Sequence, residues 1–135
     1  MNISTFFTLY LISIPLFFLI DLVWLGVIAK DFYQVRIGHL MEINWTAAIM
    51  FYVVFLIGLT YFAIYPAISN GTAWKATLLA GALFGFFTYA TYDLTNLATL
   101  RGWPLDLTLV DMVWGSVLGG SVAALTRYFY LLVQS

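Results

Sequence analysis

The stretch from residue 5 to residue 29 reads TFFTLYLISIPLFFLIDLVWLGVIA, and Asp21 is its only charged residue. A helix needs about 20 mostly apolar residues to cross the hydrocarbon core of a bilayer. The stretch therefore predicts a membrane-spanning helix. No Lys or Arg occurs in residues 1–5 and no small-residue cleavage motif follows the run. We therefore expect it to be retained as a helix rather than removed as a signal peptide.

Three further apolar runs, at 46–68, 74–100 and 107–133, have the same character and are separated by short polar segments with turn-forming Gly and Pro residues. Each run is long enough to cross a bilayer as a helix. The sequence thus predicts an all-α integral membrane protein. Its expected architecture is a four-helix bundle that forms a single transmembrane domain over residues 1–135.

The composition excludes a water-soluble protein. The chain is 64% hydrophobic and only 8% charged, whereas soluble domains carry about 25% charged residues. The lipid bilayer is therefore the expected partner. The five basic residues are scattered singly, so no basic stripe predicts nucleic-acid binding. Cysteine is absent, which excludes disulfides, thiolate metal sites and cysteine nucleophiles.

Three aspartates, Asp21, Asp93 and Asp111, lie inside the predicted spans. A charged side chain at the centre of a membrane helix costs about 2.5–3.5 kcal/mol on insertion scales. With a rise of about 1.5 Å per residue, the three lie roughly 13, 12 and 7–8 Å from the nearest polar segment. Because the first and third spans end where the fourth begins, all three are expected in one leaflet at similar depth.

Helical spacing adds polar and aromatic neighbours to this layer. Residues three or four positions apart share a helix face, which groups an asparagine and a tyrosine with Asp93 and a tryptophan with each of the other two acids. An arginine in the third loop caps the layer. The sequence therefore predicts a polar pocket, open toward the first and third loops, with these candidate ligand- or proton-binding residues: Asp21, Asp93, Asn96, Asp111, Tyr89, Trp24, Trp114 and Arg101.

Three carboxylates cannot all stay ionised at close range in a medium of low dielectric constant. Either at least one holds a proton, or a cation neutralises them. The candidates are Arg101, a metal ion, a proton or a positively charged ligand. A divalent cation would be held by Asp93 and Asp111, and the sequence predicts no other cofactor. In the alternative interpretation, each acid only bonds a neighbouring helix as a packing contact.

Three segments, YDLTNLAT at 92–99, DLVWLG at 21–26 and DMVWG at 111–115, resemble those of a family of small bacterial membrane proteins known as domain of unknown function 2177. The likeness spans nearly the whole chain. The resemblance implies a four-helix bacterial membrane protein. It also implies that Asp21, Asp93, Asn96 and Asp111 are the signature positions. It implies no activity.

Three functions are compatible with these features. In the first, the acidic pocket binds or translocates a proton, a cation or a small polar ligand. In the second, the chain is a membrane-embedded enzyme that acts on a lipid or lipoprotein through the pair Asp93 and Asp111. The absence of a Ser, His or Cys arrangement typical of hydrolases counts against an enzyme. In the third, the chain is a small structural or accessory membrane subunit.

Two small-residue spacings, Gly81-x3-Gly85 and Gly115-x3-Gly119, allow close approach of helix backbones. They predict either a contact between the third and fourth spans of one chain or a homodimer interface.

The orientation follows from basic residues near the span ends. Lys30, Arg36 and Arg101 lie on the side of the first and third loops, against Lys75 and Arg127 on the other. The positive-inside rule therefore predicts that the first and third loops face the cytoplasm, with the bacterial cytoplasmic membrane as the expected location.

Overall fold

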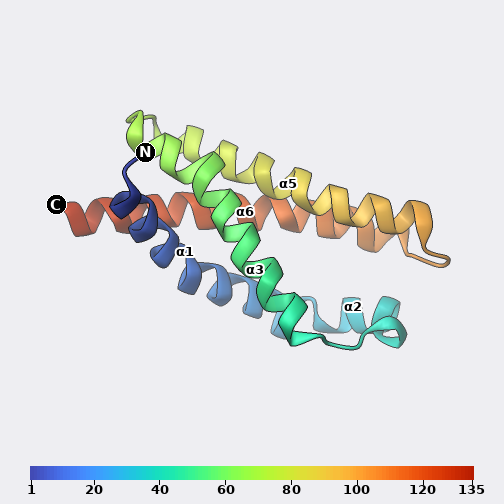
Figure 1. The fold of residues 1–135 in the computed structure, drawn as a ribbon. Coiled ribbons are helices and arrows are strands. Elements are labelled where there is room, and N and C mark those ends of the chain that lie inside the picture. The colour runs from blue at the N-terminus through green and yellow to red at the C-terminus, as the bar shows by residue number, and fades with distance from the viewer.

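The computed structural model describes all of residues 1–135 and contains helices but no strand. Figure 1 shows the two chain ends at one end of the molecule, with α2 and the turn between α5 and α6 at the other. The elements, in chain order, are α1 (Ile3–Val23) with a π-helical turn η1 (Trp24–Ile28), α2 (Lys30–Ile37), a 3-10 turn η2 (Gly38–Leu40), α3 (Trp45–Leu59) with a π-helical turn η3 (Thr60–Ile64), α4 (Tyr65–Ser69), α5 (Trp74–Thr99) and α6 (Leu105–Gln134).

Three helical segments, Ile3–Ile28, Trp45–Ser69 and Leu105–Gln134, are long and apolar enough to cross a membrane. The prediction of membrane helices is therefore confirmed for three of the four expected spans. The fourth, α5, is 26 residues long but is not among them. Its C-terminal half carries Asp93 and Asn96 together with several Thr and Tyr residues, which lower its mean hydropathy.

The helix ends follow from local side-chain chemistry. The side chain of Asn2 accepts a hydrogen bond from the backbone N–H of Thr5, and that of Asn44 accepts one from Ala47, both at 3.1 Å. These bonds satisfy amide groups that have no partner within the helix. Gly71 and Gly102, with φ of 60° and 76°, form the turns before α5 and α6, where a residue with a Cβ would be strained.

The central packing unit is the antiparallel hairpin of α5 and α6, which lie side by side along their length (Figure 1). Glycines make this contact. A Cβ on Gly81 would meet the backbone of Gly119, and a Cβ on Gly85 would meet the backbone of Gly115, well inside van der Waals contact. The two small-residue spacings therefore form an interface within one chain.

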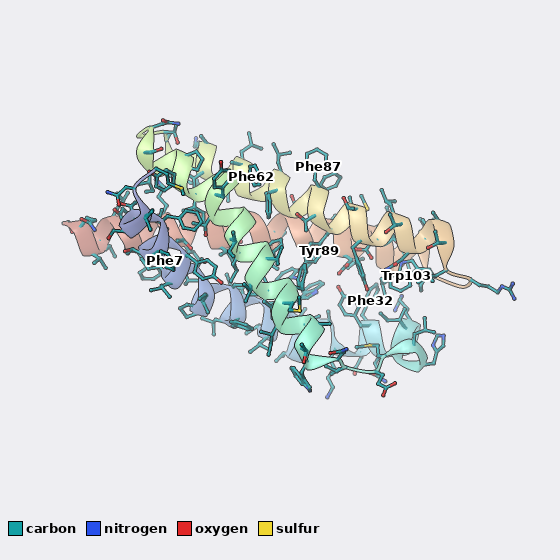
Figure 2. All side chains as sticks on the ribbon, in the orientation of Figure 1. Phe7, Phe32, Phe62, Phe87, Tyr89 and Trp103 are labelled. Atoms are coloured by element: carbon teal, nitrogen blue, oxygen red, sulfur yellow. The ribbon has the colours of Figure 1, made fainter.

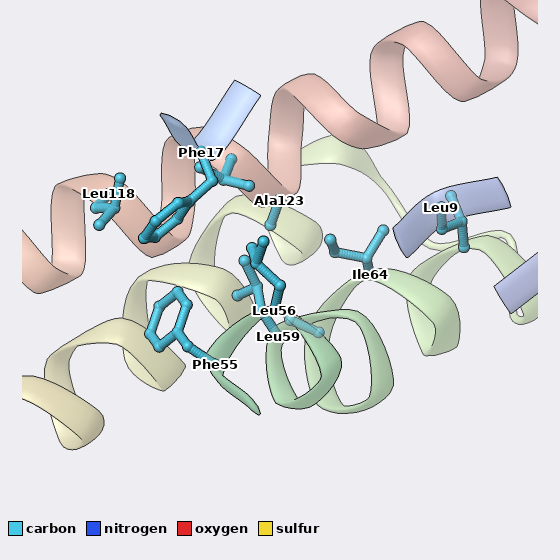
Figure 3. Packing of buried hydrophobic residues seen from close by; sticks show 10 residues of the cluster. Leu9, Phe17, Phe55, Leu56, Leu59, Ile64, Leu118 and Ala123 are labelled. Atoms are coloured by element: carbon cyan, nitrogen blue, oxygen red, sulfur yellow. The ribbon is translucent and has the colours of Figure 1, made fainter. Parts of the chain in front are cut away.

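The apolar core lies where α1, α3 and the middle of α6 meet, as Figure 3 shows. Phe17 contacts Phe55 with ring centroids 5.6 Å apart, and both pack near Leu118 of α6. The core continues toward the chain ends and includes Leu9, Leu56, Leu59, Ala63, Ile64, Val122 and Ala123. Toward the other end, α3 diverges from α5 in Figure 1, and the three aspartates lie in that half.

We predict that Gly85→Ala lowers the free energy of unfolding in detergent by about 1–3 kcal/mol, the usual cost of overpacking a well-packed contact. The helix backbones would have to separate to accept the methyl group. Gly26→Ala is the matched control, because a Cβ there has nothing within 4 Å. Equal stability of the two variants would contradict the glycine contact.

Candidate functional site

The three aspartates come from three helices and all are buried. Asp21 of α1, Asp93 of α5 and Asp111 of α6 expose 5%, 0% and 8% of their surface. Asp21 accepts a hydrogen bond on Oδ1 from the indole N–H of Trp114, at 3.3 Å. Asp111 accepts one on Oδ1 from the hydroxyl of Tyr33, at 2.5 Å. None of the three carboxyls faces away from the bundle.

Two predicted tryptophans join these carboxyls. The rings of Trp24 and Trp114 are stacked, with centroids 4.4 Å apart and planes 8° from parallel. The indole N–H of Trp24 donates to the Tyr33 hydroxyl at 3.2 Å. Tyr33 in turn donates to Asp111. A continuous polar chain thus runs from α1 through α2 to α6.

Asp21 and Asp111 line one cavity of about 150 Å³, together with Leu25, Ala48, Phe51, Tyr52, Tyr89 and Trp114. A second cavity, of about 300 Å³, is lined by Phe51, Thr88, Tyr89, Tyr92 and Asp111. The two share three lining residues and together form what we call the acidic cleft. Figure 2 shows Tyr89 pointing from α5 toward α3, where its ring lies 6.5 Å from that of Phe51.

Asp93 lines neither cavity of this cleft. It is fully buried and neither of its oxygens has a hydrogen-bond partner. Its carboxyl is close enough to interact with that of Asp111. A buried ionised carboxylate without donors costs several kcal/mol. Asp93 is therefore the most strongly uncompensated polar group at this end of the molecule.

No basic side chain neutralises the three acids. The only ion pair of the structure joins Arg36 of α2 to Asp106 at the start of α6, at 2.7 Å. Arg101 is exposed in the turn before α6 and makes no ion pair. No group of three or more His, Asp or Glu side chains lies close enough together to hold a metal ion. Asp93 and Asp111, the two residues predicted to hold a divalent cation, are near each other.

The remaining candidate is Asn96, which is half-buried on α5 beside Tyr92 and lines neither cavity. The structure thus brings together Asp21, Asp111, Trp114 and Tyr89 around the cleft and places Asp93 and Trp24 next to it. Asn96 lies to one side of it, and Arg101 lies outside it.

Sequence reasoning missed α2 and its two contacts with α6. The sequence predicts a polar loop for residues 30–45. It also predicts that Asp31 and Arg36 in this loop are exposed to water. That interpretation is wrong for Arg36, which pairs with Asp106. Phe32, Tyr33, Arg36 and Ile37 recur at the spacing of one helix face and are the half-buried residues of this helix, so the signal was present.

Tyr33 is the residue of this helix that is hydrogen-bonded to one of the three aspartates. Burial, together with the carboxyl of Asp111, raises the pKa of Tyr33 well above its usual range. The hydroxyl therefore stays protonated and keeps donating its hydrogen bond to Asp111. Because Tyr33 is hydrogen-bonded to Trp24 of η1 and to Asp111 of α6 at once, it ties α2 to both of these elements.

Comparison with known families gives one match. The family model described as "Predicted membrane protein (DUF2177)" matches residues 6–128. That range includes all three aspartates and α2. Neither the curated proteins nor the solved structures contain a match to this chain.

We predict that Tyr33→Phe loosens α2, because a hydrogen bond to a charged group contributes about 1.5–3 kcal/mol. Amide hydrogen exchange over residues 30–37 should then accelerate by roughly tenfold or more. Tyr61→Phe is the control, since Tyr61 is exposed on η3 at the other end of the molecule. Unchanged exchange in Tyr33→Phe would show that the hydroxyl does not hold α2.

Proposed function

The chain belongs to the DUF2177 family of predicted membrane proteins, and we propose that its acidic cleft binds or translocates a proton, a cation or a small polar ligand. One observation carries the proposal. Asp21 and Asp111, from helices 90 positions apart in the chain, are buried side by side around one cavity without a basic residue to neutralise them. Ionisable groups inside a membrane are expensive and mark ion or substrate pathways.

The proposal includes α5 as the fourth membrane span. This helix has 26 residues, against 26, 25 and 30 in the other three segments, and it packs antiparallel to α6 along its length. Its polar residue Asp93 faces the bundle interior rather than lipid. A four-span bundle would then keep both chain ends on one side, and α2 with the turn before α6 on the other.

The charge balance supports a cationic or protonic ligand. Two carboxylates in one water-poor cavity repel each other and lose hydration, and one opposite charge between them relieves both penalties. The protein supplies two hydrogen bonds, from Trp114 and Tyr33, but no positive charge. The missing positive charge is therefore expected to come from a bound species.

Asp93 is suited to pass a proton rather than to meet the ligand. It is close enough to Asp111 to interact with it but does not line the cleft. A proton moving between the two carboxyls would let Asp111 release or accept a cation without leaving two charges in hydrocarbon. This arrangement supports translocation in addition to binding.

The basic residues near the span ends support an orientation of the protein in the membrane. We propose that α2 and the turn before α6 face the cytoplasm of a bacterial cell, because Lys30, Arg36 and Arg101 lie there. Four helices enclose a narrow pathway, so we also propose a homodimer. Its interface would lie outside the glycine contact of α5 and α6.

A membrane-embedded enzyme with Asp93 and Asp111 as a catalytic pair is the second candidate. The closeness of the two carboxyls favours it. Only Asp111 reaches a cavity, however, so the pair would not present both carboxyls to a lipid substrate. A changed lipid composition of cells that lack the protein would support this candidate over the first.

We predict that a cation stabilises the protein in detergent and that Asp21→Asn and Asp111→Asn each abolish the effect. A ligand at about 100 times its Kd adds about 2.7 kcal/mol to stability. Thermal unfolding is measured with Na⁺, K⁺, Mg²⁺ and methylammonium as probes. Asp31→Asn is the control, because Asp31 is an exposed residue of α2. The binding proposal fails if none of the four probes raises the midpoint of the native protein.

We predict that Asp93→Asn keeps the binding of such a probe but lowers proton-coupled flux at least about tenfold. A tenfold change corresponds to about 1.4 kcal/mol, which is less than the cost of leaving one buried charge without a partner. Flux is followed in proteoliposomes that enclose a pH-sensitive dye, with an imposed gradient of the bound cation. If the flux in Asp93→Asn equalled that of the native protein, Asp93 would have no role in proton transfer.

A further inference from the structure

The acidic cleft is larger and more apolar than a site for a bare ion requires. Its two cavities, of about 150 and 300 Å³, meet along Phe51, Tyr89 and Asp111. Pockets for small organic ligands measure about 300–1,000 Å³ and are mostly lined by hydrophobic and aromatic side chains. The cleft therefore has room for an organic molecule whose polar end reaches the carboxyls.

Its walls are aromatic rather than oxygen-rich. Half of the ten residues that line the cleft are aromatic: Phe51, Tyr52, Tyr89, Tyr92 and Trp114. Ca²⁺ and Mg²⁺ require six or more oxygen ligands, bound water included, and no group of three acidic or His side chains is close enough to hold a metal ion. Aromatic faces attract organic cations, by about 0.5–2 kcal/mol for each well-placed ring.

The free oxygens of the two carboxyls point to the charged group of the ligand. Trp114 and Tyr33 both donate to Oδ1 atoms, and the Oδ2 atoms of Asp21 and Asp111 accept no hydrogen bond within the chain. Unlike the oxygens of Asp93, these atoms are not sealed from the cleft. An ammonium group offers N–H donors and a positive charge in one compact unit.

The outer wall of the cleft reaches the surface that faces lipid. Phe51 on α3 and Tyr92 on α5 are 41% and 56% exposed. An apolar chain attached to the ammonium group would therefore extend between α3 and α5 toward the hydrocarbon. No basic residue lines the cleft, so an additional anionic group on the ligand, such as a lipid phosphate, would have to lie outside it.

From this geometry we infer that the ligand of the acidic cleft is a hydrophobic organic ammonium ion. Asp111 and Asp21 bind its charged group, and Phe51, Tyr89 and Tyr92 contact its apolar part. The inference rests on the proposed binding function and narrows it to one ligand class. An amphiphilic amine and the amine headgroup of a lipid share this chemistry, and the experiment separates them.

The test compares octylammonium with methylammonium, which has the same charge without the chain. Binding of each radiolabelled amine is measured by equilibrium dialysis against the protein in dodecyl maltoside micelles, with protein-free micelles subtracted. We expect octylammonium to bind at least about tenfold more tightly, since burying each CH₂ group is favourable. Asp111→Asn should lose the binding of both amines.

Phe51→Ala should weaken octylammonium several-fold and leave methylammonium unchanged. Phe87→Ala is the matched control, because Phe87 lies on the outer face of α5 and is 63% exposed (Figure 2). Circular dichroism and size-exclusion chromatography establish that each variant is folded, and Asp21→Asn provides a second, independent carboxyl variant.

The outcomes separate the two proposals. Equal affinity for the two amines, with no effect of Phe51→Ala, would overturn the organic-ammonium inference and leave the binding proposal intact. Absence of binding by either amine, together with no stabilisation by Na⁺, K⁺ or Mg²⁺, would overturn both. Displacement of octylammonium by added phosphatidylethanolamine would support the ligand class and assign the amine to a lipid.

Discussion

The close contact between α5 and α6 is the constraint on which the rest of the structure depends. Gly81, Gly85, Gly115 and Gly119 let the two backbones touch, which brings Asp93 near Asp111. The same contact positions Tyr89, since its ring packs over Gly115 where any side chain would displace it. Close backbone approach is a common basis of helix association in membranes, because lipid provides no hydrophobic driving force between helices.

Most of the fold could be predicted from hydropathy. The helical segments begin and end within two residues of the runs at 5–29, 46–68, 74–100 and 107–133, because a bilayer fixes the length of an apolar helix. Helical spacing also identified Asp21, Asp93 and Asp111 and the tryptophans beside two of them. This reasoning works for groups on one helix, whose mutual geometry is set by the helix itself.

Contacts between helices could not be predicted in this way. Tyr33 and Asp111 are 78 positions apart and meet only because α2 folds back over the bundle end. Hydropathy wrongly predicts a loop in place of α2, because half of the residues of this helix are polar. The position of Arg101 could not be predicted either. Its separation from Asp93 in the sequence does not reveal that the turn after α5 leaves it outside the cleft. Packing between elements decides such cases.

The wide turn η1 has a consequence for the spacing of α1 and α2. Its backbone bond runs from the N–H of Ala29 to the carbonyl of Trp24, five residues back, so the turn holds one residue more than an α-helix would. Removing that residue would rotate everything after it by about 100° about the helix axis. Tyr33 would then point away from Asp111. The register of the chain at this one bulge thus decides whether α2 is hydrogen-bonded to an aspartate of the cleft.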